Sequence, residues 1–295
     1  MMIAMGWIGW SELAAATLAA AALVVLLRRR TARRAARAAR LARPFSAAEE
    51  AVLDRDFPRW RCIPADLRQR FAGNTRVLME EKNFEPCADL AAVTDEMKLV
   101  IAAQAAFILV GKDDHAFFPR LHSILVYPTG FRDHGRRRFG IDDEKRGVLY
   151  GESWETGSVI LSWDNVVAGG RNDDDGMNVV FHEFAHQIDQ YNGVADGVPY
   201  LKNRADYARW ARIMGSHYDA LVEASKTRDP EPYLDPYGAT HPCEFFAVAT
   251  ETFFEDPYGL EEEHPELYDE LVRFYGVNPA DWMEAGATAE PPSSS

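Results

Sequence analysis

The spacing of hydrophobic and polar positions along the 295-residue chain changes twice, which predicts helices on both sides of a small sheet. Apolar residues recur with helical spacing over residues 46–112. Short β-branched or aromatic runs between glycine-containing turns then predict strands at 122–131, 147–154 and 157–166. Helical spacing returns after these runs, and we expect helices at about 177–192, 203–226, 243–255 and 261–275. The chain is therefore expected to form an α+β domain, mostly helical with a small mixed sheet.

The amino-terminal 27 residues are largely apolar and are followed by three consecutive arginines. A helix of this length can span a bilayer, although the uninterrupted apolar part, Leu13–Leu27, has only about 15 residues. Basic residues follow the apolar run instead of preceding it, which favours a retained anchor over a cleaved signal peptide. We therefore expect a transmembrane helix at 1–27 in a single-pass protein of the bacterial inner membrane, with the folded domain in the cytoplasm. A buried or interfacial helix is the alternative.

The rest of the chain divides into three parts by composition. Residues 28–44 are rich in alanine and arginine and predict a basic juxtamembrane linker, either helical on anionic lipid or solvated. Ser46 followed by Glu49 resembles a capping box, so we expect the folded domain to extend over 45–280. The segment 281–295 is too polar and too rich in proline and serine to pack, and is expected to be a disordered tail.

Charge and cysteine content exclude some classes of function. The net charge is −14, but residues 1–43 contain eight arginines and one glutamate, which leaves −21 on the other residues. An acidic body of this kind argues against a nucleic-acid partner. Cys62, Cys87 and Cys243 lie far apart and form no metal-type pair, so they are read as reduced, buried thiols.

A candidate metal site lies in VVFHEFAHQID, residues 179–189. Residues four apart on a helix share a face, so His182 and His186 can bind one cation. Glu183 lies about 100° round the axis, where it can touch a water molecule bound to that cation. Zinc suits this set, and Glu183 would take a proton from the water and pass it to the leaving amine. The alternative is a core helix that contains this spacing by chance.

A third ligand must come from outside this helix. The extended pattern HExxHxxGxxH fails, because Asp189 occupies the glycine position and Asn192 the last histidine position. Downstream, an apolar and aromatic helix carries Glu244, Glu251 and Glu255. Buried carboxylates are costly unless they bind something. Glu244 and Glu251 are seven residues apart and share a face, so either can approach the metal.

Several motifs together resemble the Mlc titration factor A family of zinc metallopeptidases. The resemblance extends from about Phe45 to Asn278 and rests on ILVYPTGF, GESWETGSVILSW, HEFAHQID and YGATHPCEFFAVATETFF. It implies a zincin-like metallopeptidase fold of the gluzincin type, similar to the catalytic core of anthrax lethal factor. It also implies one zinc ion on His182, His186 and Glu244, with Glu183 as catalytic base and Tyr237 facing the developing oxyanion.

Two functions remain open on this basis. The first is a zinc peptidase at the membrane that acts on peptide or protein substrates, with the aminopeptidase-type activity that the resemblance implies. The second is a membrane-tethered binding module that sequesters a transcriptional regulator, because family members are described as binding a glucose-responsive repressor; its zinc would be structural. A metal-free helical scaffold is a third option. Glu251 and Asp189 can each orient a ligand histidine or be solvated, and Tyr237 can be a packing residue instead of a catalytic one.

Overall fold

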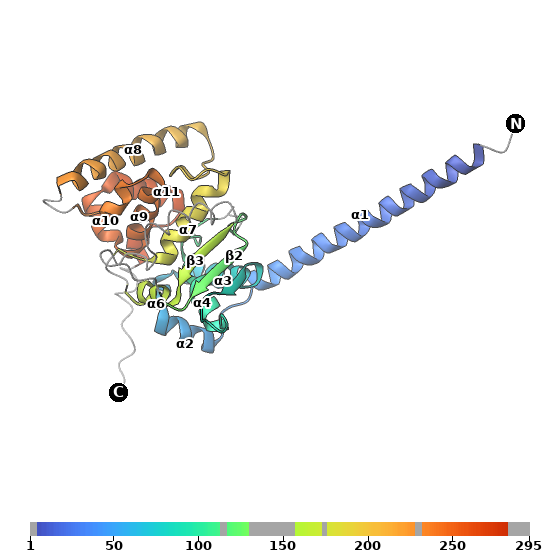
Figure 1. The fold of residues 1–295 in the computed structure, drawn as a ribbon, viewed down its shortest axis with the longest axis horizontal. Coiled ribbons are helices and arrows are strands. Elements are labelled where there is room, and N and C mark those ends of the chain that lie inside the picture. Colours follow the sequence, from blue (N-terminus) through green and yellow to red (C-terminus); the bar gives the residue numbers. More distant parts are fainter. Residues whose placement is uncertain (1–4, 113–116, 130–156, 173–175, 228–231, 283–295) are drawn as a thin grey trace.

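The body of the protein is a group of helices packed around a small parallel sheet (Figure 1). The structure is a computed structural model that describes residues 5–112, 117–129, 157–172, 176–227 and 232–282. Its sheet has the order β1-β2-β3, and both pairs of neighbouring strands are parallel. The strands are β1 (Asn83–Pro86), β2 (Ser123–Tyr127) and β3 (Ser158–Ser162).

The α+β class is confirmed, whereas the described sheet is parallel and not mixed. A helical crossover, α4 (Asp95–Phe107), returns the chain between β1 and β2, so that both strands run in the same direction. The sequence did not predict β1, because the short run NFEP has no alternating pattern. The predicted strand at 147–154 lies outside the described residues.

Most of the predicted helices are present. Ser46 and Glu49 form the expected capping box at the start of α2. The segment predicted as one helix at 261–275 is covered by two, because Pro265 has no amide hydrogen to continue the first helix and begins the second. The helical elements are α1 (Met5–Leu41), α2 (Ala47–Asp56), η1 (Pro58–Cys62), α3 (Ala65–Glu81), α4, α6 (Trp163–Arg171), α7 (Val179–Asp189), η2 (Gln190–Asn192), α8 (Arg204–Thr227), η3 (Pro236–Ala239), α9 (Pro242–Glu255), α10 (Pro257–Glu263) and α11 (Pro265–Tyr275).

An aromatic core holds α7 and α9 in place. Phe107 of α4 stacks on Phe181 of α7, with ring centroids 5.7 Å apart. Phe254 of α9 packs edge-on against Phe107 at 5.6 Å and against Tyr275 of α11 at 4.9 Å. These four side chains are buried, and each removes a large apolar surface from water. The two helices therefore meet on a rigid support.

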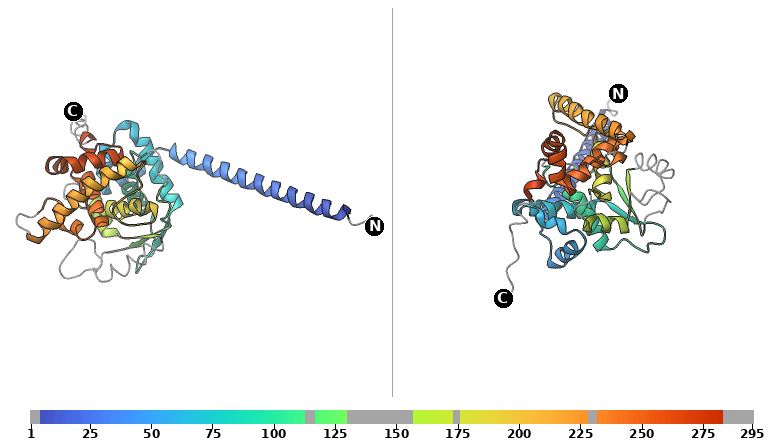
Figure 2. Two further views of the ribbon diagram at one scale, coloured as in Figure 1. Left: turned by 90° about the horizontal axis from the view of Figure 1, so that it is seen from above. Right: turned by 90° about the vertical axis from the view of Figure 1, so that its left-hand side faces the viewer.

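Helix α1 projects from the body, and only its carboxyl-terminal end packs against it (Figures 1 and 2). Near that end, Arg37 pairs with Glu81 of α3 at 3.3 Å, and its guanidinium lies 4.3 Å from the ring centroid of Phe117. The amino-terminal half of α1 extends away from these contacts (Figure 2).

The predicted membrane anchor at 1–27 and the single-pass inner-membrane localisation are wrong. Within the described parts of the chain, none of the helices is both long enough and apolar enough to cross a bilayer. The uncharged run of α1 between Glu12 and Arg28 has about 15 residues and rises about 22 Å, compared with a hydrocarbon core of about 30 Å.

Candidate metal centre

Helix α7 starts at a well-formed cap and is buried almost all round. Asn178 is its N-cap, and the side-chain oxygen accepts hydrogen bonds from the amides of Val180 and Phe181, each at 3.0 Å. Apart from Glu183, every residue of α7 is buried.

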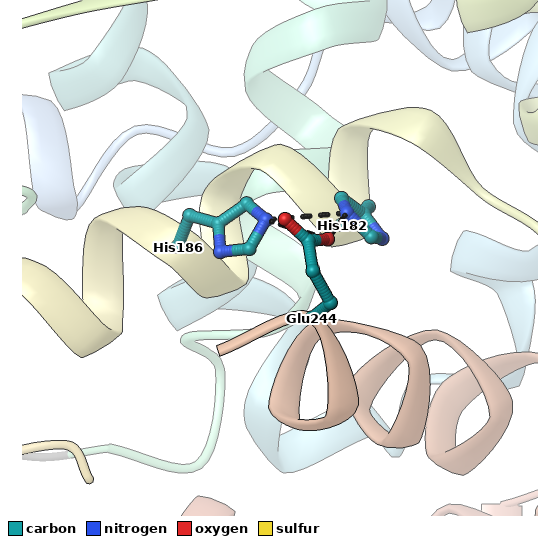
Figure 3. A group of neighbouring side chains, drawn as sticks. All are labelled: His182, His186 and Glu244. Atoms are coloured by element: carbon teal, nitrogen blue, oxygen red, sulfur yellow. Dashed lines mark hydrogen bonds and ion pairs between the residues drawn. The ribbon is translucent and has the colours of Figure 1, made fainter. Parts of the chain in front are cut away.

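The two histidines of α7 and Glu244 of α9 converge on one point (Figure 3). The Nε2 atoms of His182 and His186 are 3.2 Å apart. One carboxylate oxygen of Glu244 lies 3.0 Å from Nε2 of His182 and 3.4 Å from Nε2 of His186. Both histidines have no exposed surface, and Glu244 is 8% exposed. Helices α7 and α9, whose cluster residues are more than fifty positions apart in sequence, thus meet through three buried polar side chains in the apolar core.

This arrangement fits a zinc ion. Ligand atoms about 2.0–2.1 Å from a tetrahedral zinc lie about 3.3–3.4 Å from one another, close to the three separations found here. Two imidazole nitrogens and one carboxylate oxygen also form the donor set of a catalytic zinc site, in which a fourth position stays open. Of the residues described, these three are the ones whose ligand atoms all lie within 4.8 Å of one another. The site can therefore hold a metal, and the chemistry of its donors favours zinc.

Glu251, two turns after Glu244 on α9, fixes the orientation of His182. Its Oε1 accepts a hydrogen bond from Nδ1 of His182 at 2.6 Å, and its Oε2 accepts one from the backbone amide of Asn178 at 2.8 Å. The first bond places the proton of the ring on Nδ1 and leaves the lone pair of Nε2 directed at the metal position. The second ties the same carboxylate to the start of α7. One side chain therefore sets both the ring and the helix that carries it.

The buried charges of the cluster shift one another's pKa values. Burial disfavours the charged form of His182, but the carboxylates of Glu251 and Glu244 outweigh burial and raise its pKa to about 9. Burial acts against ionisation of Glu244 too, but His186 and His182 lower its pKa far below the usual range. Glu244 is therefore ionised, and a cation that bound here would displace the proton from His182.

Glu183 and Tyr237 lie beside the cluster. Glu183 is the partly exposed residue of α7, next to two fully buried ligands. Tyr237 lies on η3, which packs against α9, and its ring centroid is 6.1 Å from that of His182. Its position is fixed locally, because its backbone amide donates to the Asp235 carboxylate at 2.7 Å. Glu183 and Tyr237 therefore reach the neighbourhood of the cluster from two different elements, α7 and η3.

Comparison with known proteins agrees with this geometry. The profile of the glucose-regulated metallo-peptidase M90 family matches residues 26–276. The chain belongs to this family. An uncharacterized protein from Synechocystis is 39% identical over 240 residues, which cover 80% of this chain and 86% of the relative. The protein named Mlc titration factor A from Pectobacterium atrosepticum is 32% identical, covering 72% of this chain and 79% of the relative, and that from Yersinia pestis is 30% identical, covering 77% and 85%.

Membership of the M90 family confirms the resemblance inferred from the motifs. It makes the chain a metallopeptidase-family protein, with the fold and the three-residue cluster described above. Zinc as the ion and the catalytic roles of Glu183 and Tyr237 stay predictions.

Around the M90 centre, the structure adds buried polar residues that the sequence did not indicate. The side-chain amide of Asn178 donates to Gln104 at 3.0 Å and to Glu255 at 3.2 Å. Arg59 of η1 lies 3.5 Å from the Glu255 carboxylate. A polar residue such as Asn178 just before an apolar helix is a readable cap signal. Its other partners could not be read, because they lie more than seventy positions away.

Asp189, at the end of α7, holds the following loop. Its Oδ2 accepts a hydrogen bond from the amide of Gly197 at 2.9 Å, and its Oδ1 has no hydrogen-bond partner among the described residues. Burial raises the pKa of Asp189 to about 6, although the Gly197 amide acts against this. Gly197 has a φ of 77°, and its Cα lies so close to Pro242 that a side chain would not fit. Asp189 thus connects the end of α7 with the start of α9.

Proposed function

We propose that this chain is a zinc-dependent peptidase that hydrolyses peptide bonds. The observation that carries the proposal is the convergence of His182 and His186 of α7 with Glu244 of α9 within 3.0–3.4 Å. Glu183, the partly exposed residue of α7, lies beside them. A zinc site that serves only folding is normally closed by four protein ligands. Three ligands with a carboxylate alongside are the arrangement of a catalytic site.

The roles of the side chains follow from their positions. His182, His186 and Glu244 would hold a zinc ion, which would supply a Lewis acid for the substrate carbonyl and for water. Glu183 takes the proton of the attacking water and transfers it to the leaving amine. The hydroxyl of Tyr237 donates a hydrogen bond to the oxygen on which negative charge develops. Glu251 keeps the ring of His182 in the required tautomer.

The substrate class we propose is short peptides cleaved at their amino end. This aminopeptidase-type activity rests on the sequence resemblance. Strand β3 is one of the two edge strands of the described sheet and contacts α7, so it can pair with an extended substrate beside the metal ligands. Pairing of this kind would align the scissile bond with the cluster.

The decisive experiment compares wild type with Glu183→Gln. Zinc content is measured by mass spectrometry, and hydrolysis is followed with alanyl-4-nitroanilide and with an N-acetylated peptide. We expect the variant to keep one zinc per chain and to lose hydrolysis by about 10³-fold or more. Glu262→Gln on the exposed face of α10 is the matched control and should behave as wild type. Undiminished hydrolysis in Glu183→Gln would contradict the mechanism. Equal cleavage of the acetylated and the free substrate would contradict the aminopeptidase preference.

A second candidate function is capture of a transcriptional regulator. It is favoured by the name of two relatives, Mlc titration factor A, which describes a protein that titrates Mlc. In that case the zinc would be structural, and Glu183→Gln would leave binding of the regulator intact. A pull-down with purified Mlc, using wild type and Glu183→Gln in parallel, tests this function separately from hydrolysis.

A further inference from the structure

A second candidate binding site is a cavity of about 600 Å³ beside the carboxyl-terminal end of α7. Gln187 and Ile188 line it from α7, and its other walls come from the segments after α4 and before β2, from residues between α7 and α8, from the start of α8 and from the end of α11. Residues 187 and 188 lie about 100° and 200° round the helix from His186, so the cavity lies on a different side of α7 from the metal cluster. None of the three ligands lines it. The cavity is thus a site distinct from the metal centre.

The cavity has an apolar floor and an aromatic rim. Buried Leu109, Ile188 and Leu201 form part of the floor. Tyr191 and Tyr200 stand at the rim, 44% and 58% exposed, with ring centroids 5.8 Å apart. Neighbouring exposed aromatic rings are a typical feature of sites that bind planar or cyclic groups.

The charge of the lining is opposite to that of the protein. The net charge of the chain is −14, yet four cations and two anions line this cavity: Lys112, Lys202, Arg209, Arg273, Asp206 and Glu270. Both anions are used internally, because Arg209 donates to Glu270 at 2.6 Å and to Asp206 at 2.9 Å. Lys202 is exposed and forms no ion pair within the described residues. Arg273 lies 3.5 Å from Glu270 and 3.9 Å from Asp269, and it is half exposed. The lining carries more positive than negative charge, and Lys202 is the cation most open to an anion.

Gln187 is a polar side chain that opens into the cavity. It is 6% exposed, it lines the cavity, and its side-chain amide makes no hydrogen bond with any described residue. Its amide oxygen and nitrogen are not among the buried polar atoms that lack a partner, so they are open to the cavity and available to a ligand. A ligand in the cavity would supply both an acceptor and a donor for this amide.

We propose that this cavity binds a small, ring-bearing organic anion. The ring lies against Tyr191 and Tyr200 at the rim and on the apolar floor. The anionic group lies next to Lys202 and Arg273. The amide of Gln187 forms a hydrogen bond to a polar substituent. A cavity of 600 Å³ accommodates a molecule of this size and excludes a folded partner.

The test is a calorimetric titration of the full-length protein with phenyl phosphate, phenol and inorganic phosphate. We expect saturable one-to-one binding of phenyl phosphate, at least about tenfold tighter than either fragment, because only phenyl phosphate uses both the rim and the cations. The affinity should fall with rising salt. We expect Lys202→Gln to weaken binding about three- to tenfold, and Gln187→Leu about fivefold or more. Lys226→Gln, an exposed lysine at the far end of α8, is the matched control and should bind as wild type.

The outcomes that overturn the proposal are specific. One is no saturable binding of phenyl phosphate up to about 10 mM, or equally tight binding of phenol. Another is loss of binding when the metal is removed with a chelator, because the phosphate would then have been bound at the metal centre. Thermal unfolding reports whether Gln187→Leu is folded. If it is not, unchanged affinity in Lys202→Gln alone decides against the site.

Discussion

The two ends of helix α9 carry buried glutamates in different situations. At the amino-terminal end, Glu244 faces the imidazoles of His182 and His186. At the carboxyl-terminal end, Glu255 faces Arg59, whose guanidinium also donates to the carbonyl oxygens of Phe254 at 2.6 Å and Glu255 at 2.9 Å. Arg59 therefore closes the helix as a cap and balances both the carboxylate and the negative end of the helix dipole.

The difference lies in the permanence of the opposing charge. Arginine is protonated at any accessible pH, so the chain itself neutralises Glu255. The imidazoles of His182 and His186 can gain or lose a proton as pH changes, and in the neutral form they are good metal ligands. Glu244 is thus the carboxylate for which an external cation is the natural partner. Glu251 lies between these ends and connects them, because it binds both His182 and the amide of Asn178, while Asn178 binds Glu255.

The largest effect is expected at the amino-terminal end, from Glu244→Ala. Loss of a residue that only orients a ligand typically lowers metal affinity by roughly 10–100-fold. Removing a ligand itself should lower zinc affinity by more than this, and hydrolysis should fall in parallel. Zinc content after dialysis and the rate of peptide hydrolysis measure this. The free energy of unfolding of the metal-free protein should also fall, because the variant loses an ionised carboxylate that His186 and His182 stabilise in the folded state. Retention of one zinc per chain in this variant would contradict the ligand assignment.

At the other end, Glu255→Gln should act on stability and not on metal binding. It removes the carboxylate charge that faces the buried guanidinium of Arg59, so we expect a loss of about 3 kcal/mol in the free energy of unfolding, measured by urea denaturation. The exposed substitution Glu262→Gln should stay within about 0.5 kcal/mol of wild type.

A double variant sharpens the Glu255 prediction. Adding Arg59→Met to Glu255→Gln removes both charges, so the combined loss should be smaller than the sum of the two single losses. Strict additivity would show that the pair is not coupled and that Arg59 acts only through the carbonyl groups at the end of α9.

The connecting residue should give an intermediate effect. Glu251→Gln can still accept a hydrogen bond from His182, but it is a weaker acceptor and loses the charge that favours the Nδ1 tautomer. We expect zinc affinity to fall about 10–100-fold, measured by competition with a chromophoric chelator. Saturating zinc should then restore most of the hydrolysis. A purely structural role would lower stability without this rescue.

The contacts at the amino-terminal end of α9 could be predicted from the sequence better than those at its carboxyl-terminal end. His182, His186 and Glu183 are related by helical spacing alone, and Glu244 was one of three carboxylates on one later helix. Arg59 and Glu255 are 196 positions apart. No local pattern pairs them, because tertiary packing brings η1 to the end of α9.

The same limit explains the errors in the fold. The small sheet and most helices have local periodicity and were predicted, whereas β1 is too short to show alternation and the strand direction depends on the crossover through α4. The anchor at 1–27 was inferred from hydropathy near one terminus, and the length of the uncharged run, Leu13–Leu27, was the feature that argued against it.

The smallest effect tests a second arginine–glutamate pair that is less buried than Arg59 and Glu255. Arg76 of α3 holds Glu49 of α2 through two contacts of 2.8 Å, and Glu49 also completes the capping box with Ser46. Arg76 hydrogen bonds outweigh partial burial and lower the pKa of Glu49 from 4.5 to about 2. The folded state thus favours the ionised form, so the stabilisation is complete above about pH 4.5 and is lost as pH falls towards about 2.

Glu49→Gln should therefore cost about 1–2 kcal/mol at pH 7, a value reduced from the full pKa shift because Glu49 is partly exposed to solvent. The difference from wild type should shrink at pH 3.5 and become small near pH 2.5, measured by urea denaturation at each pH. Glu255→Gln serves as the comparison at pH 7, where its larger cost reflects deeper burial of the ion pair. Acidification removes only the charge of Glu49 and leaves its packing and capping contacts in place. A difference in the free energy of unfolding between Glu49→Gln and wild type that stays constant from pH 7 to pH 2.5 would therefore show that Glu49 acts through packing and capping and not through its charge.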